Sequence, residues 1–357
     1  MARVAEELGV SAMTVSNAYS HPERLSGSLR ERVFEAAERL GYAGPDPVAR
    51  SLRRRKTNLA GVLYSNPLSY AFDDPAQVLF LKGVAAAMEE AGMGLVLVPG
   101  SVGSSAEERA SAATEAAVDG FVIYSVADDD PLVEAALKRR LPVVISDQPS
   151  LEGVPRVGID DEAAARRVAE HLLDLGHERF GVVSFSLAEP DGPQGFVDGR
   201  RRTSATLRVT RTRLAGYGAA LEDAGLRWEE VPVYECFGSS EALGREGAGA
   251  LLSLDPRPTA ILCLSDRLAL GAVEAAHQRG LSVPGDLSVA GFDDVPGAAA
   301  SEPPLTTVHQ DHAEKGRVAG RLLVARLRGG ETAEDEVLLP AQPVARGSTG
   351  RAPPRAR

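Results

Sequence analysis

The stretch GVSAMTVSNAYSHPERLS, residues 9 to 26, contains the strongest structural signal near the start of the chain. Apolar residues at helical spacing over residues 2 to 8 predict a short helix, and Gly9 is the residue type that ends a helix in the left-handed conformation. Ser11 is a good N-cap for a second helix of about two turns. The pattern therefore predicts two short helices joined by a tight turn.

A third helix, capped by Ser26 and ending near Gly41, can close a three-helix core over the first two. One side of the second helix then stays free, and it carries small or hydrogen-bonding residues: Ala12, Met13, Ser16 and Asn17. Asn can pair with an adenine edge in the major groove, Met can contact a thymine methyl, and hydroxyls can meet phosphates. The alternative is a plain surface helix of a small helical bundle.

The segment PDPVARSLRRRKT, residues 45 to 57, favours DNA binding over that alternative. Its capping residues predict a helix of under two turns, which is marginally stable in water alone. Its basic side chains suit phosphates, and Leu52 is an apolar residue of the kind that wedges between base steps from the minor groove. A solvated basic linker is the alternative.

The charge distribution points the same way. Residues 1 to 57 hold ten Arg or Lys against seven Asp or Glu, whereas the rest of the chain holds 29 against 43. A basic N-terminal segment on an otherwise acidic chain suggests that this segment binds a polyanionic partner. The chain is 44% apolar, which is ample for a large core, and its two cysteines, Cys236 and Cys263, are expected to be buried free thiols.

The N-terminus has no signal-peptide pattern, and no stretch contains the roughly 18 consecutive apolar residues of a membrane span. We therefore expect a cytoplasmic protein.

From residue 58 onward, short apolar runs alternate with segments of helix length, many ending in Gly. This alternation predicts an α/β core of parallel sheets covered by helices on both faces. The runs are residues 59–65, 94–100, 120–126, 141–147, 179–186, 231–237, 259–266 and 287–294. Ligands bind at the carboxyl ends of such strands, where Asp147, Ser265, Asp266 and Asp293 lie. Taken singly, each of these is more often a helix cap or a turn residue.

In this order and spacing, residues 9–26, SLRERVFEAAERLGY (28–42) and PDPVARSLRRRKT resemble the DNA-binding head and hinge of the LacI/GalR family of bacterial repressors. The resemblance implies a helix-turn-helix domain over 1–44 and a hinge helix over 45–57. It implies base contacts from Ala12, Met13 and Asn17, backbone contacts from Ser11, Thr14, Ser16, Ser20, Arg24 and Ser26, and minor-groove contacts from Ala49, Leu52 and Arg53. The family usually has several more residues at the start, including an acidic residue where this chain has Arg3, so we expect a shortened first helix.

The motifs LGHERFGVVSF (175–185), RLAGY (213–217), GFDD (291–294) and PPLTTVHQ (303–310) are similar to the effector core of the same family. That core resembles periplasmic sugar-binding proteins, with two Rossmann-like subdomains and the ligand between them. The resemblance implies one subdomain from 58–158 and 290–315, and a second from 159–289 and 316–344. It implies chain crossings near residues 157–160, Ala290 and residues 309–315, and a flexible tail over 345–357.

The resemblance also implies an effector site. Arg213 and Asp293 fall on the pair that commonly binds effector hydroxyls or carboxylate, with weaker correspondences at Asp147, Asp160, Ser265 and Asp266. Tyr70, Phe72 and Phe237 are aromatic candidates for stacking on a sugar. A guanidinium fork opposite a carboxylate suits a polyol. Residues 186–212 are longer than the usual connection, and we expect either a flap over the cleft or a mobile surface arm.

These features predict a homodimeric transcriptional repressor that binds a pseudo-palindromic operator and a carbohydrate-like effector, without a cofactor or a metal. An enzyme is the first alternative, but the chain has no GxSxG, P-loop, GxGxxG or HExxH motif. A second alternative is a solute-binding or ligand-sensing protein of the same core fold with weakened or lost DNA binding.

Overall fold

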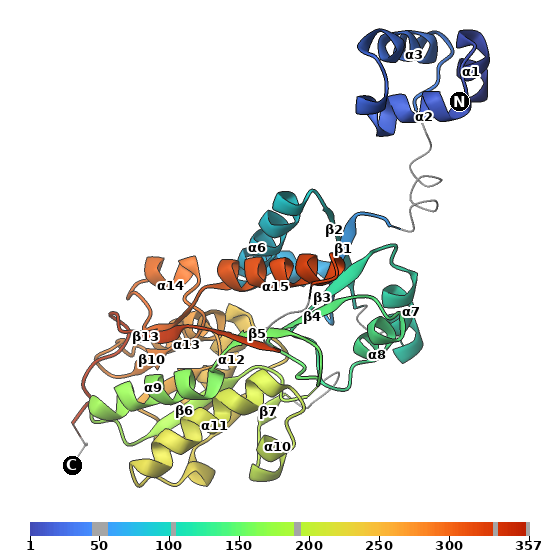
Figure 1. Ribbon diagram of the computed structural model, residues 1–357. Coiled ribbons are helices and arrows are strands. Elements are labelled where there is room, and N and C mark those ends of the chain that lie inside the picture. Colours follow the sequence, from blue (N-terminus) through green and yellow to red (C-terminus); the bar gives the residue numbers. More distant parts are fainter. Residues whose placement is uncertain (45–55, 101–104, 189–193, 331–334, 355–357) are drawn as a thin grey trace. The chain divides into compact units, whose positions relative to one another are not determined.

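The computed structural model (Figure 1) describes residues 1–44, 56–100, 105–188, 194–330 and 335–354. The chain divides into two compact units, a head over Met1–Thr57 and a core over Asn58–Arg357. Each unit is described by itself.

The head contains the predicted helix, turn and helix. Its elements are α1 (Ala2–Leu8), α2 (Ala12–Ser20), the 3-10 helix η1 (Pro22–Arg24) and α3 (Gly27–Arg39). Gly9 ends α1 with a φ of 67°, and the Ser11 hydroxyl accepts a hydrogen bond from Thr14 N at 3.0 Å. The Ser26 hydroxyl caps α3 in the same way, through Leu29 N. The predicted helix starts are therefore confirmed.

A small apolar core holds the three helices together. Its buried members come from all of them: Val4, Ala5, Val15, Ala18, Val33, Ala36 and Ala37. The ring of Tyr19 packs edge-on against Phe34, and the exposed ion pair of Glu7 with Arg39 joins α1 to α3. Small residues at the centre let short helices approach closely, so the seven-residue α1 reaches α3.

The core of the chain is built on two main sheets, as predicted. The first has the order β12-β5-β4-β3-β1-β2, and all its neighbouring strands run parallel. Its strands are β1 (Leu59–Tyr64), β2 (Gly94–Pro99), β3 (Gly120–Tyr124), β4 (Val143–Ser146), β5 (Arg156–Ile159) and β12 (Glu336–Leu339). Its helices are α5 (Leu68–Asp73), α6 (Pro75–Ala91), α7 (Ala106–Glu115), α8 (Pro131–Lys138) and α15 (His312–Leu327).

Successive residues of each strand point to opposite faces of this sheet. Val62 and Val122 share an apolar cluster with α6 and α15, whereas Leu63 and Ile123 share one with α7 and α8. Because both faces are covered, the central strands β1 and β3 are apolar along their whole length, which is the pattern that predicted them.

The second sheet has the order β10-β9-β6-β8-β7. Its strands are β6 (Phe180–Ser184), β7 (Gly195–Phe196), β8 (Val233–Glu235), β9 (Ala260–Cys263) and β10 (Ser288–Ala290). The surrounding helices are α9 (Asp161–Asp174), α10 (Gly199–Thr203), α11 (Arg208–Asp223), η2 (Trp228–Glu230), α12 (Glu241–Leu251), α13 (Asp266–Gln278) and α14 (Pro296–Ala300). Buried apolar residues from α9 and α11 fill one face, and residues from α12 and α13 fill the other, beside the buried free cysteines Cys236 and Cys263.

The positions of the chain crossings correct the predicted subdomain boundaries. β10 ends at Ala290 inside the second sheet, and bridges from Ala290 to Thr306 and from Asp293 to His309 keep the following segment beside it. The chain returns to the first sheet only at α15, which lies against α6 (Figure 1). The helices α15 and α6 pack so closely that a Cβ at Gly316 would collide with the main chain of Phe80. Residues 290–310 therefore belong to the second lobe, and α15 belongs to the first.

The last crossing follows β12. This strand pairs with β5 of the first sheet, and β13 (Ala341–Val344) then pairs antiparallel with β11 (Thr307–Gln310) and contacts α9 of the second lobe. Residues 345–354, the described part of the segment after β13, are also packed against the second lobe, contrary to the expected flexible tail. Ser348 is fully buried and bonds Thr306 N and Val289 O, and the Gly350 carbonyl accepts a hydrogen bond from His177.

The insertion over 186–212 has its own structure among its described residues, which exclude 189–193. β7 adds an antiparallel edge strand to β8, and α10 follows it. Arg201 binds the buried carboxylate of Glu235 through two hydrogen bonds, and Arg202 stacks over Trp228. These contacts fasten the described part of the segment to the second sheet, which disagrees with a mobile surface arm, one of the two expected alternatives. The other alternative, a flap over the cleft, stays a prediction.

Among the helices of the described residues, none has the length and apolar character needed to span a membrane.

Candidate DNA-binding face and effector pocket

The outward face of α2 is the candidate DNA-reading surface. Val15 and Ala18 are buried, whereas Ala12 is exposed and the Met13 side chain is 65% exposed. The exposed Met13 side chain is free to contact a thymine methyl group in the major groove. The partly exposed predicted residues are Thr14, Ser16, Asn17 and Ser20.

Two of the predicted backbone contacts also have structural roles. The hydroxyls of Ser11 and Ser26 cap α2 and α3, and Ser11 additionally bonds the Thr14 hydroxyl at 2.9 Å. Arg24 is exposed at the end of η1. Helix N-termini present unpaired N–H groups that favour phosphates, so capping and phosphate contact are compatible. The predicted minor-groove residues Ala49, Leu52 and Arg53 lie outside the described residues.

The core contains a cavity of about 810 Å³ between its two lobes. The loop after β1, together with α5 and the start of α6, lines it from the first lobe, and α11 and the loops after β8 and β9 line it from the second. Six of the predicted effector residues line this cavity: Tyr70, Asp147, Arg213, Phe237, Ser265 and Asp293. The cavity is the candidate effector pocket.

Arg213 is the best-fixed cation of the pocket. Its Nε donates to Asp161 Oδ1 at 2.8 Å, its Nη1 donates to the Leu264 carbonyl, and Nη1 lies 3.6 Å from Asp293 Oδ1. The guanidinium also lies 3.6 Å from the centre of the Phe292 ring. A planar cation held by carboxylates and an aromatic face is a pre-organised donor for a ligand oxygen.

A second buried cation, Lys315, extends this network to the first lobe. Its Nζ donates to Asp147 Oδ1 at 2.7 Å and to Gln310 Oε1 at 2.6 Å. Gln310 in turn donates to Asp293 Oδ1 at 2.7 Å. The chain of contacts therefore runs from Asp147 in the first lobe to Arg213 in the second and passes along one wall of the pocket.

The electrostatics of the pocket reflect its burial. Burial raises the pKa of Asp293 to about 7, although Arg213 opposes the shift. Burial likewise raises the pKa of Asp74 and lowers that of His312 well below its usual range. At neutral pH His312 is therefore an uncharged imidazole, able to donate from one nitrogen and accept at the other.

Backbone strain gathers at the same place. Ser125, Asp147 and Asp293 line the pocket and have φ angles of 49°, 64° and 117°, in the region that favours glycine. Strained non-glycine residues commonly cluster at ligand sites.

Three predicted effector residues do not line the pocket, and each has a local explanation. Phe72 is 61% exposed on α5. Asp160 caps α9, where its Oδ1 accepts from Ala163 N at 2.9 Å. Asp266 is fully buried, and its carboxylate accepts hydrogen bonds from Val295 N and the Thr307 hydroxyl, which positions the loop that carries Asp293.

Sequence reasoning missed several polar residues of the pocket, namely Tyr64, Asp74, Gln77, Arg109, Gln148, Gln310, His312 and Lys315. One signal was available for Lys315. It shares the spacing of Ala319 and Leu323 on the buried face of α15, and a charged residue in an apolar stripe indicates a buried partner.

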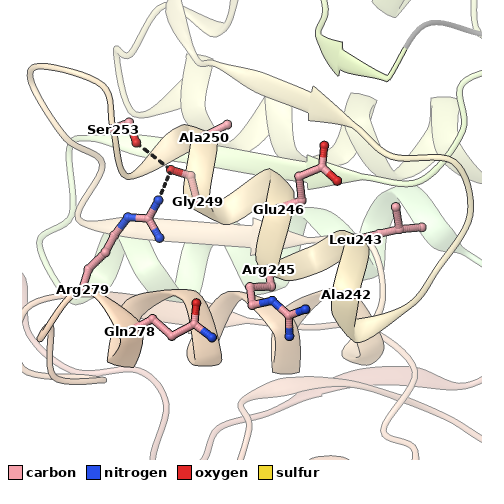
Figure 2. A pocket seen from close by; sticks show the side chains of 9 residues that line it. All are labelled: Ala242, Leu243, Arg245, Glu246, Gly249, Ala250, Ser253, Gln278 and Arg279. Carbon is pink, nitrogen blue, oxygen red and sulfur yellow. Dashed lines mark hydrogen bonds between the residues drawn. The ribbon is translucent and has the colours of Figure 1, made fainter.

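A surface depression between α12 and α13 differs from the effector pocket (Figure 2). Arg279 and Ser253 both donate to the Gly249 carbonyl, as the dashed lines show. Arg245 and Gln278 both bind Glu274, and Glu246 accepts from Tyr234. Because its polar side chains are already paired, we do not regard this depression as a ligand site.

A helix-turn-helix head and a two-lobed core with a polar pocket between the lobes define the class of ligand-responsive DNA-binding regulators. Comparison with known proteins agrees for both units. The model of "Bacterial regulatory proteins, lacI family" matches residues 1–44, and the model of a "Periplasmic binding protein-like domain" matches residues 169–349.

Two curated relatives cover nearly the whole chain. The chain is 47% identical over 333 residues to HTH-type transcriptional regulator Rv3575c of Mycobacterium tuberculosis, which covers 92% of this chain and 91% of the relative. It is 42% identical over 342 residues to HTH-type transcriptional regulator IpsA of Corynebacterium glutamicum, at 95% and 94% coverage.

Solved structures show the same architecture. A LacI-family transcriptional regulator from Corynebacterium glutamicum has a TM-score of 0.75 at 37% identity and covers 98% of both chains. The lac repressor dimer bound to operator and the anti-inducer ONPF has a TM-score of 0.79 at 26% identity, and the CelR–cellobiose complex 0.70 at 28%. Each covers 97% of this chain and 98% of its own. The chain belongs to the LacI family of bacterial transcriptional regulators, as the sequence predicted, and it is not an enzyme.

Proposed function

We propose that this regulator binds a pseudo-palindromic operator as a homodimer and represses transcription. We propose further that a sugar or a related polyol in the pocket between the lobes controls its operator affinity. The observation that carries the effector part is the pairing of Arg213 with Asp293 at 3.6 Å inside a cavity of about 810 Å³. A fixed donor beside a carboxylate acceptor matches adjacent hydroxyl groups.

The exposed face of α2 supports operator binding. One short recognition helix contacts few bases, and a two-fold dimer doubles the sequence that is read. The lac repressor structure, a dimer bound to operator, is an example of this arrangement in a similar chain. The CelR structure, which contains cellobiose, supports a carbohydrate effector. In this proposal Asn17 and Met13 contact bases, and Leu52 and Arg53 of the hinge contact the minor groove.

Operator binding is tested by selecting a randomised duplex library with the full chain and measuring the selected site by mobility shift at two salt concentrations. An Asn–adenine pair contributes about 1–3 kcal/mol, so Asn17→Ala should weaken binding about fivefold or more. Glu35→Ala, an exposed change on α3, is the control and should leave the affinity unchanged. If no specific site is selected, or if Asn17→Ala binds like the control, the operator proposal is wrong.

Effector binding is tested by a thermal-shift screen of sugars, polyols and nucleosides. Arg213→Ala leaves two buried carboxylates without their cation and can fail to fold, so Asp293→Asn is the second variant, because it preserves volume. Asp160→Asn is the matched control, since Asn also caps helices and Asp160 does not line the pocket. A hit that stabilises the control but not Asp293→Asn supports the site, whereas equal stabilisation of both would overturn it.

A further inference from the structure

The inserted segment over residues 186–212 ends at the effector pocket. Ser186, its first residue, and Leu207, Val209 and Thr210, near its end, line the cavity. The described residues between Ser186 and Leu207 do not line it, so β7 and α10 lie outside the lining. The middle of the segment can therefore influence a bound effector only through the residues at its two ends.

Two hydrogen bonds join these ends to each other. The carbonyl of the buried Leu187 accepts from Leu207 N at 3.1 Å, and the Ser186 carbonyl accepts from the Thr210 hydroxyl at 2.8 Å. A shift of Leu187 would therefore move the lining residues Leu207 and Thr210 with it. We call the paired stretch the inserted wall, which consists of residues 186–187 and 207–210.

A buried carboxylate connects the inserted wall to α10. Glu235 is 2% exposed, and its Oε1 accepts hydrogen bonds from Leu187 N and from Arg201 Nη2, both at 2.8 Å. Its Oε2 accepts from Arg201 Nε at 2.6 Å. Arg201 supplies the positive charge that a buried carboxylate needs. Without Arg201 the carboxylate would relax toward water, and this movement would pull it away from Leu187 N.

The other end of the inserted wall contacts the first lobe. Val209 N donates to Gln148 Oε1 at 2.8 Å, and Gln148 is a buried residue that follows β4 and lines the pocket. Val209 and Arg213 are four residues apart, so they lie on the same side of α11. The position of the inserted wall therefore affects both the bond between the lobes and the start of the helix that carries Arg213.

Resting on the effector function proposed above, we propose that Arg201 is a positioning residue for effector binding. Although Arg201 does not line the pocket, it holds the inserted wall in place through Glu235 and Leu187. The inserted segment is thus a part of the effector site, and the Arg201–Glu235 pair contributes to the affinity for the effector without touching it.

The neighbouring Arg202 provides a matched control. Its guanidinium lies 4.9 Å from the centre of the Trp228 ring, and it donates to the carbonyls of Trp228 and Val231. Neither Trp228 nor Val231 lines the pocket. Loss of the Arg202 side chain should therefore destabilise the same helix without displacing the inserted wall.

The first measurement is calorimetry on the full chain with the sugar or polyol that stabilises wild type most in the screen described above. Arg201→Met should weaken binding about threefold to tenfold, the loss expected when one hydrogen bond that holds the lining is weakened. Arg202→Met should lower the melting temperature but bind like wild type. Wild-type affinity in Arg201→Met, or an equal loss of affinity in both variants, would overturn the proposal.

A double variant, Arg201→Met with Glu235→Gln, serves if Arg201→Met does not fold, because it leaves no unpaired charge buried. The amide oxygen can still accept from Leu187 N, but α10 no longer holds it in place. This variant should also bind about threefold to tenfold more weakly than wild type. Wild-type affinity in the double variant would contradict the proposal.

The second measurement needs no effector. Hydrogen exchange, followed by mass spectrometry well below the melting temperature, reports on the amides of Leu187 and Leu207, whose hydrogen bonds hold the inserted wall. Peptides that contain these amides should exchange faster in Arg201→Met than in wild type, and at the wild-type rate in Arg202→Met. Wild-type exchange in Arg201→Met would show that Arg201 does not position the inserted wall.

The two proposals fail differently. Binding that is lost in Asp293→Asn but unchanged in Arg201→Met keeps the effector site and overturns the present inference. Binding that is insensitive to Asp293→Asn, or a screen in which no sugar or polyol stabilises the chain, overturns the proposed effector function itself.

Discussion

At the scale of single residues, Asp293 is the group in the pocket whose charge should respond most to physiological pH. Its pKa is raised from the ordinary 3.8 to about 7, chiefly by burial and also by the nearby Asp74, while Arg213, Gln310 and Lys315 oppose the rise. The folded chain thus binds this proton more tightly than the unfolded chain does.

The first prediction concerns folding stability against pH. Because the folded state holds the proton more tightly, the contribution of Asp293 to the free energy of unfolding is greatest below about pH 4. It falls as the pH rises to about 7 and is constant above that. The Asn side chain of Asp293→Asn cannot ionise. The melting temperature of this variant relative to that of wild type should therefore increase as the pH is raised from about 5 to about 7. Calorimetric scans in matched buffers measure the difference.

Asp160→Asn is the control for this series, because Asp160 is an exposed helix cap. A difference in melting temperature between Asp293→Asn and wild type that stays constant with pH would contradict the prediction.

At the scale of elements, the inserted β7–α10 segment is fastened through one buried carboxylate. Glu235 is 2% exposed, and it accepts two hydrogen bonds from Arg201, at 2.6 and 2.8 Å, and one from Leu187 N. A bidentate Arg–carboxylate pair of this burial resists removal of either partner.

The second prediction follows from that pair. Arg201→Met leaves the Glu235 carboxylate buried without its cation and should lower the free energy of unfolding by about 2–3 kcal/mol. Arg200→Met changes a neighbouring exposed arginine and should remain within about 0.5 kcal/mol of wild type. Urea denaturation measures both. Equal losses in the two variants would show that the pair does not anchor the segment.

Element by element, local patterns predicted most of the fold, and long-range contacts explain the errors. The eight apolar runs all became strands, because a strand covered on both faces is apolar throughout. The apolar stripe of α15 fits either sheet equally well, and only the close approach of Gly316 to α6 assigns it to the first lobe. The weakly apolar β12 and the two-residue β7 gave no signal.

The residues of the pocket, like the elements of the fold, were predictable from the sequence only in part. Asp266 and Asp293 both follow apolar runs, yet only Asp293 faces the cavity, since Asp266 accepts hydrogen bonds from Val295 N and Thr307. Residue type and spacing cannot distinguish a buried loop anchor from a ligand contact. The burial of Tyr64, Gln77 and His312 likewise results from tertiary packing, which residue type and spacing do not show.

At the scale of the whole molecule, a few hydrogen bonds connect the lobes around the pocket. The Tyr70 hydroxyl on α5 accepts from Ser239 N at 3.1 Å and donates to the Ser239 carbonyl at 3.3 Å. Gln148 Oε1 accepts from Val209 N at 2.8 Å. Each of these contacts joins a residue of the first lobe to a residue of the second beside the cavity.

The third prediction is that Tyr70→Phe shortens the residence time of the effector. The ring stays in the pocket, but both hydrogen bonds to Ser239 are lost, so the lobes separate more easily and dissociation should accelerate about threefold to tenfold. Stopped-flow dissociation measures the rate. Phe72→Leu alters an exposed residue of the same helix and should dissociate like wild type. Similar acceleration in both variants would mean that α5 acts through its fold and not through Ser239.

The fourth prediction joins the head to the core. If the effector changes operator affinity by some factor, thermodynamic linkage requires the operator to change effector affinity by the same factor, typically about 5- to 150-fold.

Effector titrations with and without saturating operator duplex measure the change in effector affinity. Operator titrations with and without saturating effector measure the change in operator affinity. The two factors should agree in wild type, and they should also agree in Asp293→Asn once both ligands saturate, because linkage does not depend on how tightly the effector binds. A scrambled duplex is the control, because nonspecific phosphate contacts should leave effector affinity unchanged. If saturating effector leaves operator affinity unchanged, both factors equal one, and the proposed control of operator affinity by the effector is wrong.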